Sequence, residues 1–195
     1  MKLQDTLPDT ITIGRRKYKV DLDFRNVLNM METLARDDLM PEAREFLAVK
    51  CVMKPPKNVQ AALIALKRIL FPDTKKGADR QKITDFVQDA DLIRGAFLQS
   101  YNINLFREKL HWLEFSSLLS CLPEGTRYSE ILGIRSRPMP KATKYNADER
   151  NWLAKAKAEY ALEMTEKEAE NNYNRGVKDV FLGLMSIAKG GENHG

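Results

Sequence analysis

A run of apolar residues between positions 86 and 101 constrains the fold of this chain more than any other feature. The apolar positions are spaced by three or four residues and comprise Phe86, Ala90, Ile93, Phe97 and Tyr101. This spacing places all of them on one side of an α-helix. Because a helix with a continuous apolar side must be covered by other elements, the pattern predicts a packed helical protein.

A second apolar stripe predicts a partner helix for the first. It follows the turn-like Asn102-Ile103-Asn104 and consists of Trp112, Phe115, Leu119 and Leu122. Two such stripes joined by a short turn predict an αα-hairpin whose helices pack face to face. The stretch from residue 89 to 115 is thus rich in packing residues and poor in reactive ones.

The start of the chain has the alternating pattern of a β-hairpin. Ile11 and Ile13 alternate with threonines, Tyr18 and Val20 alternate with charged residues, and Gly14-Arg15 stands between the two runs. Glycine at the first central position suits a type II′ turn. Because two strands alone are only marginally stable in water, we expect the hairpin to dock on helices or to pair with another subunit.

Three helices are predicted between residues 23 and 71. Asp21 or Asp23 caps the first, and Pro41 opens the second because proline fits the first helical turn. Their inner faces are marked, in chain order, by Phe24, Val27, Leu28, Met31 and Leu34; by Phe46, Val49 and Met53; and by Val59, Ala62, Leu63, Leu66 and Leu70. Residues 72–81, PDTKKGADRQ, are polar and predict a surface loop.

The composition changes after residue 135 and predicts two parts. Residues 1–135 form a helical core domain with the hairpin, closed by a short helix that ends near Gly133. Residues 136–195 form a linker and a helical C-terminal extension, capped by Asn146 or Asp148, with a narrow apolar stripe of Trp152, Ala156, Tyr160 and Met164. The fold class is therefore mainly α: a compact multi-helix domain, a small N-terminal β-hairpin and a helical C-terminal extension.

The last apolar stripe is the candidate partner-binding site. It consists of Val177, Val180, Phe181, Leu184 and Ile187. An amphipathic helix that follows a proline-containing linker suits helix-in-groove recognition of a partner. The alternative, that this segment folds back onto its own domain, fits the pattern equally well.

Charge and hydropathy limit the classes of partner. The net charge is +5, and most basic residues alternate with acidic ones except at residues 15–19 and 135–157. We therefore expect only weak, non-specific binding of nucleic acid. No apolar run reaches the roughly 18 to 20 residues of a membrane span, and the N-terminus lacks the apolar core of a signal peptide, so we expect a cytoplasmic protein that binds no membrane.

The chain offers little catalytic or metal-binding chemistry. Its histidines are His111, expected to be partly buried within a helix, and His194 near the C-terminus. Cys51 and Cys121 lack partners at metal-ligand spacing and are expected to be reduced, buried thiols within helices. We therefore expect no metal site and no cofactor.

The carboxylates and glycines also form no recognisable catalytic or phosphate-binding motif. Pairs such as Asp89 and Asp91 lie at predicted helix ends, where capping and the helix dipole explain them. The glycines are scattered and form no phosphate-binding loop, and no nucleophile motif occurs. We therefore expect a protein without enzymatic activity.

Four motifs in a fixed order resemble one known family. They are GRRKYKVDLDFR, then D-A-D-L-I-x-x-x-F-x-x-x-Y-x-I-x-L, then L-H-W-x-x-F, then I-L-G-I-R. Their order and spacing, from Ile11 to Arg135, resemble the Gp-fifteen family of long-tailed bacteriophages and their prophages. The sequence departs from the family pattern at Asn102 and Asn104, where Gly and Asp are common, and at Leu113, where a second aromatic residue is common.

The resemblance implies a role in tail assembly. Members resemble non-enzymatic tail assembly chaperones, which keep the tape-measure protein soluble and help the tail-tube protein to polymerise around it. Such a protein would act in the cytoplasm of an infected or lysogenic host, would be absent from the finished virion, and could form homo-oligomers. The alternative is a structural head-to-tail connector or tail-completion protein that remains in the particle.

Overall fold

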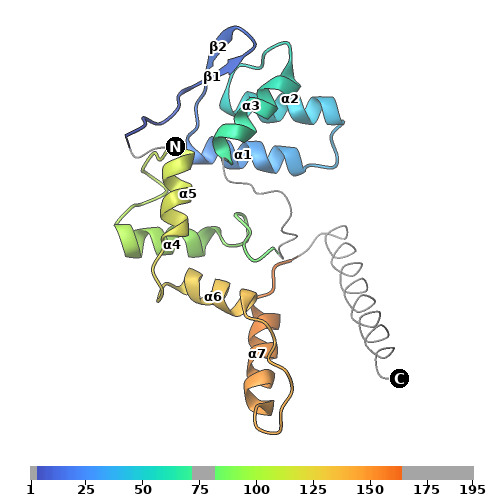
Figure 1. Cartoon of the computed structure of the whole chain (residues 1–195), viewed down its shortest axis with the longest axis vertical. Coiled ribbons are helices and arrows are strands. Elements are labelled where there is room, and N and C mark those ends of the chain that lie inside the picture. Colours follow the sequence, from blue (N-terminus) through green and yellow to red (C-terminus); the bar gives the residue numbers. More distant parts are fainter. Residues whose placement is uncertain (1–3, 72–81, 164–195) are drawn as a thin grey trace, which may run out of the picture.

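The computed structural model describes residues 4–71 and 82–163 (Figure 1). The described residues form a mainly α fold with a two-stranded hairpin, which confirms the predicted fold class. Their elements are β1 (Thr10–Ile13), β2 (Arg16–Lys19), α1 (Phe24–Ala35), α2 (Pro41–Val52), α3 (Val59–Leu70), α4 (Ala90–Tyr101), α5 (Trp112–Ser120), α6 (Arg127–Ser136) and α7 (Ala147–Glu159).

The hairpin has the predicted turn. Ile13 pairs with Arg16, so Gly14 and Arg15 form a two-residue turn. Gly14 has a φ of 62°, and Arg15 is not among the residues of positive φ, as a type II′ turn requires. β1 packs against α3 and buries Ile11, so the hairpin docks on helices as expected.

Helices α1 to α3 form around the hairpin with the predicted start signals. Asp23, not Asp21, caps α1 and accepts a hydrogen bond from the Arg25 backbone N–H at 2.9 Å. Pro41 opens α2, as predicted. The prediction for the inner face of α2 is wrong in one respect: Phe46 is exposed, because Ala48, Val49 and Val52 fill the interface instead.

The two central helices differ in extent from the predicted αα-hairpin. α4 begins only at Ala90, so Phe86 lies in the turn before it. α4 ends at Tyr101, and its C-cap Asn102 has a left-handed φ of 54°. The connection to α5 runs from Asn102 to His111 and is much longer than the predicted three-residue turn. α5 ends at Ser120, so Leu122 lies beyond it.

The C-terminal elements correct two further expectations. α6 continues past Gly133 to Ser136. In α7, which follows Asn146, the buried residues are Leu153 and Ala156, whereas Trp152 is exposed. The predicted stripe is therefore correct at Ala156 and wrong at Trp152, while Met164 lies outside the described residues. α7 packs against α6. The division into residues 1–135 and 136–195 remains a prediction.

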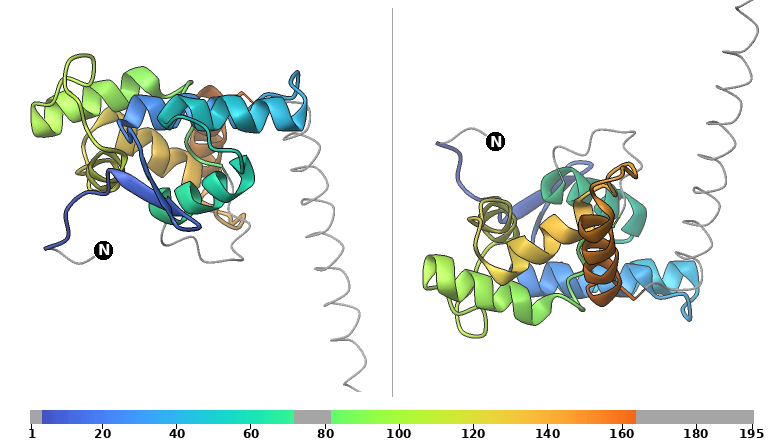
Figure 2. Two further views of the ribbon diagram at one scale, coloured as in Figure 1. Left: turned by 90° about the horizontal axis from the view of Figure 1, so that it is seen from above. Right: turned by 90° about the horizontal axis from the view of Figure 1, so that it is seen from below.

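One apolar core joins the hairpin and helices α1 to α5 and extends to Tyr128 at the start of α6. In Figure 1, α4 lies below α1, with α5 running between them and α6 below α4, and α1 and α4 therefore overlap in the views of Figure 2. α7 lies at the far end from the hairpin (Figure 1). Within the described ranges, no helix combines the length and apolar character needed to cross a bilayer.

Candidate functional site

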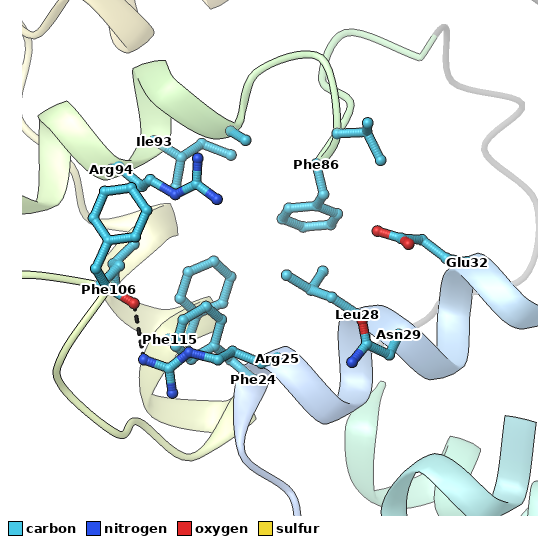
Figure 3. A pocket seen from close by; sticks show the side chains of 13 residues that line it. Phe24, Arg25, Leu28, Asn29, Glu32, Phe86, Ile93, Arg94, Phe106 and Phe115 are labelled. Carbon is cyan, nitrogen blue, oxygen red and sulfur yellow. Dashed lines mark hydrogen bonds between the residues drawn. The ribbon is translucent and has the colours of Figure 1, made fainter.

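A cleft of about 460 Å³ lies between α1 and α4 (Figure 3), and we name it the α1–α4 cleft. Its floor is apolar and formed by Phe24, Leu28, Phe86, Ile93 and Phe115. In Figure 3, Phe86 points from the turn before α4 into the space above Leu28. Arg25, Asn29, Glu32 and Arg94 also line the cleft, which therefore combines an apolar floor with polar and charged walls.

Backbone pairing brings the distant walls of the cleft together. The Phe24 N–H donates to the Leu110 carbonyl at 3.0 Å, and the Trp112 N–H donates to the Leu22 carbonyl at 2.7 Å. These bonds hold the starts of α1 and α5 side by side. The first residues of the two helices can therefore contribute to one floor.

Arg25 fixes the loop that forms one end of the cleft. Its Nη1 lies 3.1 Å from the Asp23 carboxylate, and its Nη2 donates to the carbonyls of Leu105 at 2.8 Å and Glu108 at 2.6 Å. One guanidinium thus binds α1 to the loop between α4 and α5. This contact positions the loop that carries Phe106 at the cleft rim.

The floor rests on a set of contacting aromatic rings, the aromatic stack: Phe24, Phe86, Phe97, Trp112 and Phe115. Phe115 is stacked between Phe24, at a centroid distance of 4.7 Å, and Phe97, at 5.2 Å. Phe86 meets Trp112 edge-on at 6.1 Å. Trp112 also donates from Nε1 to the Leu70 carbonyl at 3.0 Å, which ties the stack to α3.

Large apolar side chains are exposed at the rim of the cleft. Val87 is 64% exposed and Phe106 is 72% exposed. The Arg94 guanidinium lies 4.6 Å from the Phe106 ring centroid and 2.8 Å from Asp91. These two exposed apolar groups beside the apolar floor are the candidate contact surface of the site.

Asp85 shapes the turn that carries Phe86 and Val87. Its Oδ1 accepts hydrogen bonds from the backbone N–H groups of Val87 at 2.9 Å and Gln88 at 3.0 Å, and Lys82 Nζ lies 2.8 Å from Oδ2. Burial raises the pKa of Asp85, but the hydrogen bonds from Lys82, Gln88 and Val87 outweigh it and hold this pKa below its ordinary value. The carboxylate is therefore ionised at neutral pH and stabilises the turn.

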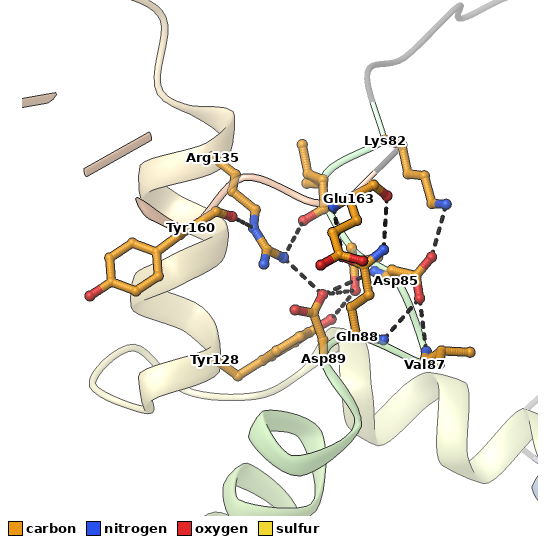
Figure 4. Close-up of polar contacts among 11 residues, drawn as sticks. Lys82, Asp85, Val87, Gln88, Asp89, Tyr128, Arg135, Tyr160 and Glu163 are labelled. Atoms are coloured by element: carbon orange, nitrogen blue, oxygen red, sulfur yellow. Dashed lines mark hydrogen bonds and ion pairs between the residues drawn. The ribbon is translucent and has the colours of Figure 1, made fainter. Parts of the chain in front are cut away.

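A buried ion pair lies next to this turn (Figure 4). Arg135 Nη1 on α6 lies 2.8 Å from Asp89 Oδ2, and the two side chains are 11% and 1% exposed. Arg135 also donates to the carbonyls of Ile83 at 3.1 Å and Tyr160 at 2.6 Å. We call Asp89, Arg135 and these partners the polar hub. It joins the segment before α4, α6 and the segment after α7.

Tyr128 completes the wall of the polar hub. Its hydroxyl lies 2.9 Å from the Thr84 hydroxyl, which in turn donates to Asp89 at 3.3 Å. Burial raises the pKa of Tyr128, and the negative charge of Asp89 raises it further, against the opposing effects of Thr84 and Arg135. The phenol therefore stays protonated and able to donate at neutral pH.

The last described residue returns to the mouth of the cleft. Gln88 Nε2 donates to the Glu163 carbonyl at 2.9 Å, and the Glu163 N–H donates to Gln88 Oε1 at 2.7 Å. Figure 4 shows Gln88 and Glu163 beside the polar hub. Because Gln88 directly follows Val87, the chain leaves the described region next to the cleft rim.

The sequence-predicted partner-binding residues Val177, Val180, Phe181, Leu184 and Ile187 lie outside the described residues. So do His194 and the predicted surface loop 72–81. Their predicted roles stay predictions.

Two predicted environments are wrong in part, although His111 is partly buried as expected. His111 is not inside a helix: it is the N-cap of α5, where its Nδ1 accepts from the Leu113 N–H at 3.1 Å and Glu114 completes a capping box. Cys121 is exposed, because it lies at the C-cap of α5, while Cys51 within α2 is partly buried. In the described part of the chain, no three His, Cys, Asp or Glu side chains are grouped to hold a metal ion.

Sequence reasoning missed the main features of the site. Asp89 occupies the N-cap position of α4 but makes no capping bond, because its carboxylate pairs with Arg135 instead. Both residues occur in the motifs quoted above, yet one sequence carries no signal that pairs positions 46 apart in the chain. Val87 and Phe106 were missed because exposure is not visible in a pattern of apolar residues.

Comparison with known proteins identifies the family. The family model described as Bacteriophage Gp15 protein matches residues 3–162. No curated protein and no solved structure matches the chain. The matched region includes the α1–α4 cleft, the aromatic stack and the polar hub, and it extends through α7. The chain therefore belongs to the bacteriophage Gp15 protein family and is a phage structural or morphogenesis protein.

Proposed function

We propose that this protein is a non-enzymatic tail assembly chaperone that binds the phage tape-measure protein and keeps it soluble while the tail is built. The observation that carries the proposal is an open apolar cleft, with Val87 and Phe106 exposed at its rim, in a member of a phage family. The chaperone acts in the cytoplasm of the bacterial host and leaves before the virion is complete.

The chemistry of the cleft suits such a client. A long helical protein exposes an apolar stripe until a tube encloses it, and exposed stripes of this kind drive aggregation. A cleft with an aliphatic and aromatic floor can accept one stretch of such a stripe, as in helix-in-groove recognition. Many weakly bound copies along one client would gain affinity through avidity when they also contact one another.

The remaining surfaces fit a protein partner in the same way. The stripe at Val177, Val180, Phe181, Leu184 and Ile187 is a second proposed client contact or a contact between copies. The tail-tube protein is a second proposed partner. The proposal requires no cofactor, no metal, no membrane and no specific nucleic acid.

Co-expression with the tape-measure protein of the same gene cluster tests the function. The full-length chain is expected to increase the soluble tape-measure fraction and to co-purify with it. The double variant Val87→Asp, Phe106→Ala is expected to lose both effects, because it places a charge at the rim and removes an exposed ring. Ile64→Asp is the matched control, since Ile64 is a 54% exposed apolar residue on α3 that does not line the cleft.

Two results would overturn this proposal. One is an unchanged soluble fraction of the tape-measure protein in the presence of the wild-type chain. The other is equal loss of co-purification in the cleft variant and the Ile64→Asp control, which would remove the cleft from the interaction.

The second candidate function is a structural connector or tail-completion protein. Exposed apolar residues on α2 and α7, among them Phe46 and Trp152, favour it because permanent subunit contacts need several such surfaces. Mass spectrometry of purified virions separates the two functions. The chaperone is expected to be absent from the particles, whereas a connector would be present in stoichiometric amounts.

A further inference from the structure

We infer that residues 177–187 of this chain occupy the α1–α4 cleft of the same molecule when no client is bound. This inference rests on the proposed function, because the cleft is the proposed client site. The inference adds that the cleft has an intramolecular occupant. In the free protein, the apolar cleft and the apolar stripe of residues 177–187 would then cover each other. A client helix displaces the segment and makes both surfaces available.

The cleft needs a cover in the free protein. Its rim exposes most of Val87 and Phe106, and its floor is lined by Phe86 and Leu28. Open apolar surface of this kind promotes self-association when it is left in water. A chaperone made before its client therefore benefits from a cover that can be displaced.

The position of Glu163 indicates which segment occupies the cleft. Glu163 is clamped to Gln88 by two hydrogen bonds, and Gln88 is the neighbour of the rim residue Val87. The polar hub reinforces this position, since Arg135 donates to the Tyr160 carbonyl at 2.6 Å. Residues 164–195 therefore begin beside the cleft mouth.

The connecting length is sufficient. The thirteen residues 164–176 separate Glu163 from the apolar stripe. They span about 20 Å if helical and up to roughly 43 Å if extended, at 1.5 Å and about 3.3 Å per residue. The cleft begins at Val87, next to the anchor, so the stripe can reach the whole floor without strain on the clamp.

The pattern of the stripe matches the floor. Val177, Val180, Phe181, Leu184 and Ile187 recur at the spacing of one helix face, and they include one aromatic and four aliphatic residues. The apolar part of the cleft lining is likewise aromatic and aliphatic, and Arg25, Asn29, Glu32 and Arg94 complete the lining. A short tether gives an effective concentration in the millimolar range, so even a weak contact of this kind is populated.

Thiol labelling of the full-length protein tests the inference in the absence of any client. Both native cysteines are replaced, as Cys51→Ser and Cys121→Ser, and one new thiol is placed at the rim as Val87→Cys. We expect maleimide to label this thiol on the order of tenfold more slowly than after the added changes Phe181→Asp and Leu184→Asp. That factor corresponds to a tether at about 1 mM and a dissociation constant of about 0.1 mM.

Ile64→Cys in the same background is the matched control, because Ile64 is also exposed but lies outside the cleft. Its labelling rate is expected to be the same with and without the two aspartates. Equal rates at Val87→Cys in both proteins would overturn the inference. Protection that increases with protein concentration would also overturn it, since a second copy would then supply the occupant.

This test is separate from that of the proposed function. Labelling is measured on the protein alone, whereas the chaperone function is read from solubility of the tape-measure protein. Equal labelling rates with the stripe intact and with the two aspartates, together with normal client binding, refute the intramolecular occupant but not the chaperone function. Intact protection without any effect on the tape-measure protein refutes the chaperone function.

Discussion

Two regions hold helix α4 through different interactions, namely apolar packing along its length and a buried ion pair at its start. Along its length, Ile93 and Phe97 pack into the apolar core, and Phe97 stacks on Phe115. At its start, the Asp89 carboxylate is buried and paired with Arg135. Apolar packing tolerates many orientations, whereas a buried ion pair is favourable only in a narrow geometry.

The difference assigns a separate role to each region. The aromatic stack buries Phe24, Phe97, Trp112 and Phe115, and burial of such large rings contributes strongly to stability. The polar hub contributes less net stability, because removing both charges from water offsets much of their attraction. Its main effect is to fix where the segment before α4 and the segment after α7 meet, at the cleft mouth.

The largest expected effect comes from the aromatic stack. Phe97→Ala removes a fully buried ring and is expected to lower the free energy of unfolding by about 3–5 kcal/mol, through lost burial and a cavity. Urea denaturation followed by circular dichroism measures it. A loss below about 1 kcal/mol would show that the stack is not the main source of stability.

The polar hub gives the next largest effect. Asp89→Ala leaves the Arg135 charge buried without its carboxylate and is expected to lower the free energy of unfolding by about 3 kcal/mol. The double variant Asp89→Leu, Arg135→Met is expected to cost less than the single one, because no unpaired charge remains. A double variant that is less stable than Asp89→Ala would contradict the assignment of the hub to geometry.

The pH dependence of stability tests the contribution of a second carboxylate, Asp85, which lies in the turn before α4. Its folded-state pKa is depressed, so the stabilisation is present above its unfolded pKa of about 3.9 and is lost as pH falls through the folded value. At pH 7, Asp85→Ala is expected to cost about 1 kcal/mol, as for a lost cap. Thermal unfolding between pH 2 and 7 measures the cost of the substitution and its pH dependence. The difference in stability between wild type and Asp85→Ala is expected to shrink towards pH 2.

The smallest effect on stability is expected at the cleft rim. Val87→Asp changes an exposed side chain and should alter the free energy of unfolding by no more than about 0.5 kcal/mol. The same variant is expected to weaken co-purification with the tape-measure protein. A large loss of stability would mean that Val87 belongs to the core contacts of the stack and not to a free rim.

The sequence predicted the helix starts and the hairpin turn correctly where residues close in sequence determine them. Gly14 set the hairpin turn, Asp23 capped α1 and Pro41 opened α2. Predictions failed where a neighbour decided the outcome. Phe46 has the right spacing for an inner face but is exposed, and Trp152 was favoured over Leu153, because a helical period leaves the exact buried arc open.

The candidate site was less predictable than the fold. The apolar residues of its floor were recognised as packing residues, but not as the walls of a cleft, because Phe24 and Phe86 lie far apart in sequence. His111 illustrates the same limit: its type suggested a residue inside a helix, whereas its backbone position made it the cap of α5.

The sequence by itself determined a mainly α fold, the order of its elements and membership of a phage family, since these depend on periodicity, turn residues and motif order. Only the tertiary structure decided that Asp89 pairs with Arg135, that the rim of the α1–α4 cleft stays exposed, and that Glu163 returns to Gln88. Those features depend on contacts between residues 46 and 75 positions apart. No local pattern encodes such contacts, because packing between distant elements selects them when the chain folds.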